Sequence, residues 1–392
     1  MAEFKKDVAI IGVGNCGSQI ALLAEKKYPT LFDAVYINTS QADLSMVDSS
    51  SIKFKIGNED DIEGSGKNRT KMKNYLKDEI EKILSDKNFL DLISKKKYVF
   101  IASSAAGGTG SGASPVFLEI MRQAFVDTHF ILVSVLPKIK DSLADQGNAL
   151  EFLSELYESL SDGTTYMIYD NESVVDQSPT RALEIVNENI IEDIRVLTGV
   201  DNFPTQYESI DPADMESIIT TPGRLLVARV SNNITEKNME DTRFDEMLIK
   251  AIKQSCQTET DRNKKVVRWG IITYFSDPVN KLYTTSLDKL EEFIGSPEER
   301  FNHNAINKDG NENMNFMYLI ASGLSPINDR AKKMRDRVQE LKNALATDET
   351  NKYILAGDDV SRDALSIRKR DEKRATTPEV FKPKDVFAKF LK

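Results

Sequence analysis

The sequence predicts an α/β fold with a Rossmann-like parallel sheet, a long central helix and a smaller α/β domain after it. Two observations support this prediction. Short apolar runs alternate with helical patterns through the first 170 residues, as in βαβ units. Glycine-rich segments also follow two of the apolar runs, where such sheets bind ligands. A length of 392 residues exceeds the roughly 100–200 of one domain. We therefore expect an N-terminal domain over 1–200, a C-terminal domain over 201–345 and a charged tail over 346–392.

The elements of the first domain follow from periodicity. Strands are expected near 7–13, 33–38, 97–103, 129–135 and 165–169, and helices at 17–28, 68–86, 115–126 and 144–160. The central helix is predicted at 179–198, because Ser178 and Pro179 supply a cap and a first-turn proline, and Gly199 supplies a stop. Beyond it, strands are predicted at 224–231, 266–275 and 314–322, and helices at 212–220, 241–254, 286–295 and 327–345.

Composition excludes several classes of protein. With 40% hydrophobic and 29% charged residues, the chain has the balance of a globular protein in water. The net charge of -10 argues against binding nucleic acid over the whole surface. Two cysteines and two histidines cannot build a disulfide framework or a tetrahedral zinc site, and His303 is predicted to lie in a polar loop. No apolar run approaches the roughly 20 residues of a membrane span, so we expect a cytoplasmic protein without a membrane partner.

The first glycine segment, Gly12–Gly17, has the form G-x-G-x-x-G between a strand and a helix. Such a turn brings backbone N–H groups close to phosphates. A dinucleotide site also needs an acidic residue at the end of the second strand. That strand ends at Asn38, and Asp33 lies at its other end. An NAD(P)-dependent oxidoreductase is therefore the weaker hypothesis.

Two further loops suggest phosphate binding. The segment Ala106–Gly112 contains four glycines and two hydroxyl residues directly after an apolar run, which favours a row of N–H donors around a phosphate chain. The segment Gly64–Arg69 resembles a P-loop only superficially, because Lys67 is followed by Asn68 rather than Ser or Thr. It could deliver a cation and N–H groups to a terminal phosphate, or it could be a solvated turn.

Three segments together resemble the tubulin/FtsZ superfamily of GTP-dependent filament proteins: Gly107–Gly112, Asn15–Ile20 and Asp170–Glu172. The strand end Asn38-Thr39 is similar to that of the bacterial FtsZ proteins, and the resemblance covers residues 8–230. Within the superfamily, the chain looks most similar to the TubZ/PhuZ group of bacterial plasmids and large phages. This narrower resemblance rests on chain length, the loop at 64–69 and the charged tail. The resemblance implies a GTP-binding domain, a central helix, a second domain and a variable tail.

The resemblance also implies which residues bind GTP or GDP. They are Gly14, Asn15, Cys16, Gly17, Asn38, Gly66, Lys67, Asn68, Ala106, Gly107, Gly108, Thr109, Gly110, Ser111, Asn171 and Asn187. Asn171 would meet the guanine or its ribose. Asn187 on the central helix would recognise the base, since an amide offers both a donor and an acceptor, with Asn189 as the alternative. Mg²⁺ would be held through the nucleotide phosphates and water, with no protein ligand.

The segment Ser209–Asp214 resembles the family's Asn-x-Asp-x-x-Asp catalytic loop, with Ser209 in place of the first Asn. The resemblance implies that Asp211 and Asp214 enter the pocket of the next subunit and polarise the water that attacks GTP. The same residues fit a capping box, in which Asp211 caps a helix that starts at Pro212. Both interpretations are compatible, because a cap would fix the loop that presents the carboxylates.

The end of the chain combines a basic cluster at 368–374 with five apolar residues, Phe381, Val386, Phe387, Phe390 and Leu391. It could dock on a neighbouring subunit, bind an adaptor protein on DNA, or be a passive solvated end. The resemblance thus implies a GTPase that polymerises head to tail in a bacterial host, for positioning or segregating plasmid or phage DNA. The alternatives are the oxidoreductase and a GTP-binding adaptor that does not polymerise. The cargo, the strand number and the polarity of the filament stay open.

Overall fold

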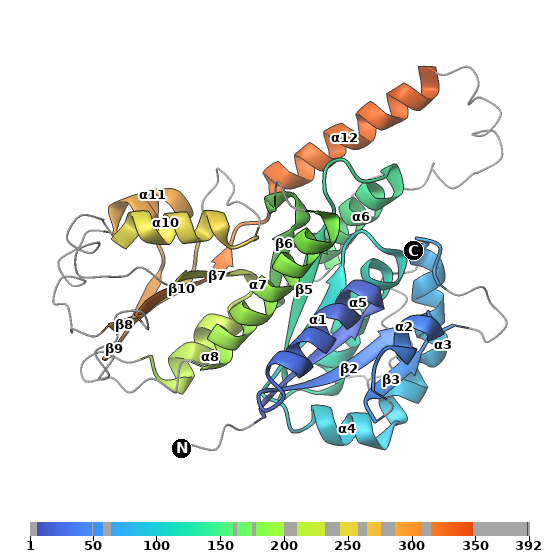
Figure 1. The fold of residues 1–392 in the computed structure, drawn as a ribbon, viewed down its shortest axis with the longest axis horizontal. Coiled ribbons are helices and arrows are strands. Elements are labelled where there is room, and N and C mark those ends of the chain that lie inside the picture. Colours follow the sequence, from blue (N-terminus) through green and yellow to red (C-terminus); the bar gives the residue numbers. More distant parts are fainter. Residues whose placement is uncertain are drawn as a thin grey trace, which may run out of the picture.

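A computed structural model describes residues 6–48, 50–57, 64–159, 163–174, 178–199, 210–231, 244–257, 265–275, 287–306, 315–347 and 390 (Figure 1). Ser209 and almost all of the predicted tail lie outside these residues. In the described part of the chain, no helix is both long enough and apolar enough to cross a membrane.

The N-terminal half forms a parallel sheet with the doubly wound strand order β3-β2-β1-β4-β5-β6. Its strands are β1 (Val8–Val13), β2 (Phe32–Asn38), β3 (Ile52–Lys55), β4 (Tyr98–Ser104), β5 (His129–Leu136) and β6 (Thr165–Asp170). All neighbouring strands in this half pair in parallel. Their carboxyl ends therefore share one edge of the sheet, and the predicted Rossmann-like architecture is confirmed.

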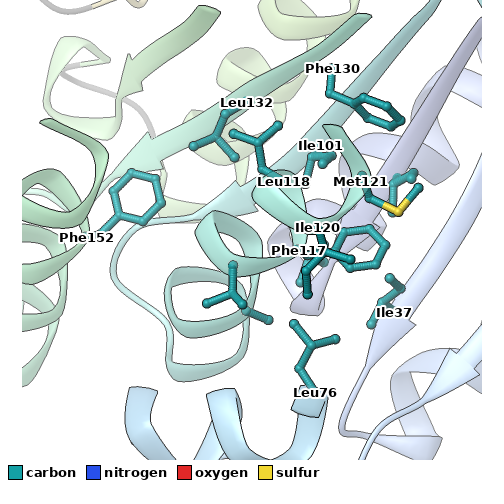
Figure 2. Close-up of a cluster of buried hydrophobic side chains, with 14 of the residues drawn as sticks. Ile37, Leu76, Ile101, Phe117, Leu118, Ile120, Met121, Phe130, Leu132 and Phe152 are labelled. Carbon is teal, nitrogen blue, oxygen red and sulfur yellow. The ribbon is translucent and has the colours of Figure 1, made fainter. Parts of the chain in front are cut away.

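Helices cover both faces of this sheet, which is why its central strands are largely apolar. On one face lie α1 (Gly14–Lys27), α2 (Gln41–Ser45) and α7 (Pro179–Gly199). On the other lie α3 (Arg69–Ser85), α4 (Lys87–Ile93), α5 (Gly108–Ala124) and α6 (Leu143–Ser159). Figure 2 shows the core on this second face, where Ile101 and Leu132 of the sheet lie among Phe117 of α5 and Phe152 of α6. The segment Ala106–Gly112 was predicted as a loop before a helix, but from Gly108 onward it forms the first turn of α5.

The second half continues the same sheet with the order β7-β10-β8-β9 (Figure 1). After α7, which confirms the predicted central helix, come α8 (Pro212–Thr220), β7 (Gly223–Ser231), α10 (Phe244–Gln254), β8 (Arg268–Phe275), α11 (Asp288–Ile294), β9 (Glu299–Ile306), β10 (Phe316–Leu324) and α12 (Asn328–Thr347). Strand β7 meets β6 at two residue pairs only, Thr165 with Gly223 and Tyr166 with Arg224. A separate core around Trp269 packs β7, β8 and β10 against α10 and α11.

A buried ionic group joins the central helix to the second half of the sheet. Asp193 of α7 is fully buried and accepts from Arg229 Nε of β7 at 2.6 Å, Tyr169 Oη at 2.8 Å and Gln257 Nε2 at 3.0 Å. Burial raises the pKa of Asp193 to about 6, although these three donors favour its charged form. The carboxylate is thus mostly ionised at pH 7 and compensates the guanidinium of Arg229.

Replacing Asp193 by Ala is expected to lower the free energy of unfolding by about 3–5 kcal/mol, because it leaves the Arg229 guanidinium without its counter-charge and the buried Tyr169 hydroxyl without its acceptor. Denaturant unfolding near pH 7.5 measures this loss. Glu184→Ala on the same helix is the matched control: Glu184 is exposed and pairs with Arg181 at 3.0 Å, so its loss should change stability by less than about 1 kcal/mol. Equal effects of the two changes would contradict this account of the joint.

Candidate nucleotide-binding site

Two helix N-termini meet at the carboxyl ends of the paired strands β1 and β4. Gly14 begins α1 with a φ of +72°, and Gly107 is the N-cap of α5. Neither helix has a side chain that caps its first N–H groups. A Cβ on Gly14 would lie 3.1 Å from the backbone N of Gly110, so the two first turns are in contact. Uncapped N–H groups and two positive helix ends at one place form a site for an anion.

At Gly12 and Gly17, the end of β1 and the start of α1 are packed too closely for a side chain. A Cβ on Gly17 would lie 2.0 Å from the backbone O of Ala102, and one on Gly12 would lie 2.4 Å from the O of Gly17. The glycines therefore bring the start of α1 directly onto the end of β4. Asn15 is exposed beside them, where its side chain is accessible to a ligand.

The end of β2 is tied to the glycine segment of α5. The Asn38 side chain is 2% exposed; its Oδ1 accepts from Thr39 N at 2.8 Å, and its Nδ2 donates to Asp43 Oδ2 at 3.0 Å. These bonds fix the turn after the strand. They hold Thr39 Oγ1 at 3.1 Å from Thr109 Oγ1. Thr39 therefore lies at the candidate site, although it is not among the residues that the resemblance implies.

The third loop lies against the second. A Cβ on Gly108 would lie 2.2 Å from Ser65 Oγ. Asn148 of α6 donates to the backbone O of both Lys67, at 3.0 Å, and Ala106, at 2.9 Å, and so bridges the two loops. Asn68 caps α3 by accepting from Lys71 N at 2.8 Å. The segment Gly64–Arg69 therefore packs against the glycine segment of α5 through Ser65, while Gly66, Lys67 and Asn68 are exposed.

The ammonium of Lys67 is held by α6. It donates to Asp145 Oδ2 at 2.7 Å and to Ser142 Oγ at 3.3 Å, and the backbone of Lys67 has a φ of +62°. Asp145 is a partner that sequence reasoning missed. Because the Lys67 side chain is about half exposed, at 48%, this ion pair is weak enough to open toward a phosphate.

A buried arginine orders the end of β6. Arg330 of α12 donates through Nε to Asp170 Oδ2 at 2.5 Å, and through Nη2 to Asp170 Oδ1 at 3.0 Å and Pro137 O at 2.6 Å. Asn171 follows directly, in the short helix η1 (Asn171–Ser173). Its Oδ1 is buried and has no hydrogen-bond partner among the described residues. A buried acceptor of this kind calls for a donor from a ligand or water.

The two asparagines of the central helix differ in what they contact. Asn189 donates to Ile185 O at 2.9 Å and to Cys256 Sγ at 3.4 Å, and accepts from Arg229 at 2.5 Å. The backbone of Cys256 pairs with Asp170, the last residue of β6, so Asn189 is level with the edge of the sheet. Asn187 is partly exposed and lies about 3 Å nearer the helix start. These contacts favour Asn187 over Asn189 as the residue available to a ligand.

Comparison with known proteins shows the family of the N-terminal domain. Residues 7–179 match the Tubulin/FtsZ family, GTPase domain. The chain carries a tubulin-like GTPase domain. TubZ of a Clostridium botulinum C phage is 23% identical over 347 residues, which cover 84% of this chain and 86% of that protein. The solved structure of tail-truncated TubZ from Clostridium botulinum phage c-st has a TM-score of 0.68 at 19% identity and covers 87% of this chain and 99% of its own. A GTPγS-form protofilament of Bacillus thuringiensis serovar israelensis TubZ has a TM-score of 0.67 at 16% identity. The match covers 87% of this chain and 92% of that one.

Two residues of the tubulin-like domain argue against other activities. Asp33 is misplaced for binding the ribose of a dinucleotide, and Cys16 is unsuited to be a nucleophile. Asp33 lies at the amino end of β2, where Lys6 at 2.7 Å and Lys96 at 2.5 Å hold its carboxylate, away from the glycine loops. It cannot anchor a ribose there. Burial raises the pKa of the Cys16 thiol to about 12, so Cys16 is a packing residue rather than a thiolate.

The predicted catalytic loop lies at the opposite edge of the sheet. Asp211 caps α8 by accepting from Asp214 N at 2.8 Å, and Asp214 Oδ2 accepts from Asp211 N at 3.3 Å, which confirms the capping box. Two residues further on, Glu216 pairs with Lys97 at 3.1 Å and His129 at 2.9 Å. Both partners lie at the amino ends of β4 and β5.

The second half of the sheet positions this loop. His303 Nδ1 accepts from the backbone N of Ile210 at 3.1 Å, and a Cβ on Gly270 of β8 would lie 3.0 Å from the side chains of Ile210 and Ile218. His303 is 3% exposed and belongs to β9, so its prediction as part of a polar loop was wrong. Among the residues that the structure describes, no three His, Cys, Asp or Glu side chains are grouped to hold a metal ion.

Proposed function

We propose that the chain binds GTP at the carboxyl edge of its parallel sheet and hydrolyses it in a head-to-tail polymer. The observation that carries the GTP site is the contact between the uncapped N-termini of α1 and α5 at Gly14 and Gly110. Phosphates bind to N–H groups that no side chain occupies. The family match over 7–179 supports GTP as the nucleotide.

In this proposal the phosphates lie along Gly14–Gly17 and Ala106–Ser111, with the loop Gly66–Asn68 beside the terminal one. Asn38 fixes the turn that supports them. The buried Oδ1 of Asn171 accepts from the ribose or the guanine, and Asn187 recognises the base. Mg²⁺ would be held through the phosphates and water, and when bound it would supply charge neutralisation for phosphoryl transfer.

Hydrolysis requires a second subunit, because Asp211 and Asp214 cannot reach the site on their own chain. Strand β4 separates the glycine loops from Lys97, the partner of Glu216, and its seven residues span roughly 20 Å. A carboxylate side chain covers only a small part of that distance. We therefore assign these aspartates to the pocket of the next subunit, where they orient and polarise the attacking water.

A contact between opposite edges of two identical subunits is heterologous, and without rotational closure it produces a filament. The protofilament form of the similar Bacillus thuringiensis TubZ supports the same arrangement here. We further propose that the filament acts in the cytoplasm of a bacterial host on plasmid or phage DNA, coupled to it through an adaptor protein. The phage origin of the similar Clostridium botulinum TubZ supports this role.

The shared site predicts that GTP turnover per subunit rises steeply above a threshold protein concentration. Phosphate release, measured from well below to well above the threshold for light scattering, tests this, and electron microscopy with GTP shows the polymer. A turnover per subunit that is constant over the whole range would contradict hydrolysis in trans. GTP protection against heat without scattering would instead indicate a GTP-binding adaptor, and protection by NADH alone an oxidoreductase.

A further inference from the structure

Phe390 packs against the GTPase domain. Phe390 is 7% exposed and belongs to the core cluster shared by the sheet, α3, α5 and α6. Lys73 of α3 donates to the backbone O of Phe390 at 2.9 Å, and its ammonium lies 5.8 Å from the centre of the Phe390 ring.

Lys73 is an uncommon partner because it is itself buried, with 6% exposure. Burial lowers its pKa, although the neighbouring Glu155 favours the charged form. A buried ammonium is costly unless acceptors surround it. Glu155 of α6 provides one acceptor, and the Phe390 carbonyl together with its ring provides another. Removal of the tail end would leave Lys73 with fewer acceptors, so Lys73 would interact more strongly with Glu155.

Glu155 is shared with Arg69, which contacts the phosphate-loop helix. Arg69 is 5% exposed and donates to Glu155 Oε2 at 2.7 Å. It also donates through Nε to Ser111 Oγ at 3.2 Å and through Nη2 to Ser111 O at 2.9 Å. Ser111 Oγ in turn donates to the O of Gly107, the N-cap of α5. A continuous polar chain thus connects Phe390 to the start of the second glycine loop.

We propose that the surface between α3 and α6 is a binding site for the aromatic end of this chain's own tail, and that its occupancy is coupled to the phosphate loop through Lys73, Glu155 and Arg69. The coupling rests on the proposed GTP site. When Phe390 leaves, Lys73 draws Glu155 away from Arg69, and Arg69 holds Ser111 less firmly. The tail end therefore acts as an internal ligand that strengthens GTP binding.

Docking is tested with Phe390→Trp in the full-length chain with GDP. Trp269 is the sole native tryptophan and is fully buried, so the introduced indole reports the tail end directly. We expect this indole to be shielded from acrylamide, and Lys73→Met to expose it, whereas Lys82→Met should not. Lys82 is on the same helix, with its side chain 73% exposed. Quenching of the introduced indole as in a free peptide would overturn the docking. Shielding that disappears on dilution would assign the site to the tail of a second copy and overturn docking within one chain.

Coupling is tested by calorimetric titration of GTPγS into the full-length wild type and Phe390→Ala below the assembly threshold. We expect affinity to fall roughly 3- to 30-fold for Phe390→Ala and for Lys73→Met, with no further loss in the double variant. Phe381→Ala makes the same truncation elsewhere in the tail and should leave affinity unchanged. Unchanged affinity in Phe390→Ala, or a loss that adds fully to that of Lys73→Met, would overturn the coupling. Absence of GTPγS binding by the wild type would instead refute the proposed GTP site, while the quenching measurement on Phe390→Trp would still test docking.

Discussion

Asp214→Asn is expected to lower GTP turnover by about 10²–10⁴-fold while leaving GTP affinity within about twofold of the wild type. The reason is the geometry of one subunit: the carboxylate lies at the amino edge of the sheet, and the glycine loops lie at the carboxyl edge. Loss of its charge removes the group that polarises the attacking water in the next subunit. Filaments should therefore still form with GTP and should persist longer. Phosphate release, GTP titration and sedimentation measure these three quantities.

The amide is a better replacement than alanine because it preserves local structure. Asp214 Oδ2 accepts from Asp211 N at 3.3 Å, and an asparagine oxygen can do the same. Asp211→Ala, in contrast, removes the cap that Asp214 N requires and costs about 1 kcal/mol of helix stability in addition to the charge. Slow GTP turnover in Asp211→Ala could thus come from the lost cap or from the lost charge. Slow turnover in Asp214→Asn would come from the lost charge.

Glu216→Gln is the matched control, since it makes the same chemical change on the same helix, two residues further along. Glu216 is occupied by Lys97 and His129 at the surface of its own subunit, so its replacement should leave turnover per assembled subunit within about threefold. If Asp214→Asn hydrolysed GTP at the wild-type rate, or if both variants lost turnover equally, the catalytic assignment would be wrong.

The parallel half of the fold could be predicted because its strands are buried on both faces. In β1, Val8 and Ile10 face α1 and α7 while Ala9 and Ile11 face α3, α5 and α6, so the run is continuously apolar. The edge strands gave no such pattern. Strand β3 has only four residues, two of them lysines, and β9 contains charged and amide residues, including Arg300. Edge strands avoid apolar surfaces that would pair with other chains, and this hides them in sequence.

The glycine loops of the site could also be predicted, because their requirement is local: a backbone that must approach another backbone needs Gly. The polar residues that fix these loops could not. Arg330 is 160 residues from Asp170, and Asn148 reaches Lys67 across 81 residues. No spacing rule connects such pairs, since folding of α12 and α6 over the sheet brings them together. His303 shows the same limit, because its partner Ile210 is 93 residues away.

Gly108→Val is expected to lower GTP affinity at least about 100-fold, by displacement of the third loop from the second. A Cβ at this position would lie 2.2 Å from Ser65 Oγ, 2.7 Å from Lys67 Cα and 2.8 Å from Asn68 N. The hydroxyl can rotate away, but the two backbone atoms cannot move without shifting the loop. A misplacement of about 1 Å at a site that positions phosphates is enough for an effect of this size.

Thr109→Ala separates the geometry of this loop from its chemistry. It removes a hydroxyl and the contact with Thr39 Oγ1, but introduces no steric overlap, so affinity should fall by less than about 10-fold. Gly147→Ala provides the control for an added methyl group, since a Cβ at that position of α6 meets no atom within 4 Å. It should leave affinity unchanged and should stabilise the helix slightly.

Calorimetric titration with GTPγS, together with thermal unfolding of each variant, distinguishes these effects. We expect the order Gly147→Ala, Thr109→Ala, Gly108→Val in increasing loss of affinity, with Gly108→Val still folded because the added atoms face a surface loop rather than the core. Mild and equal losses for Thr109→Ala and Gly108→Val would mean that the close contact between the second and third loops does not hold the nucleotide.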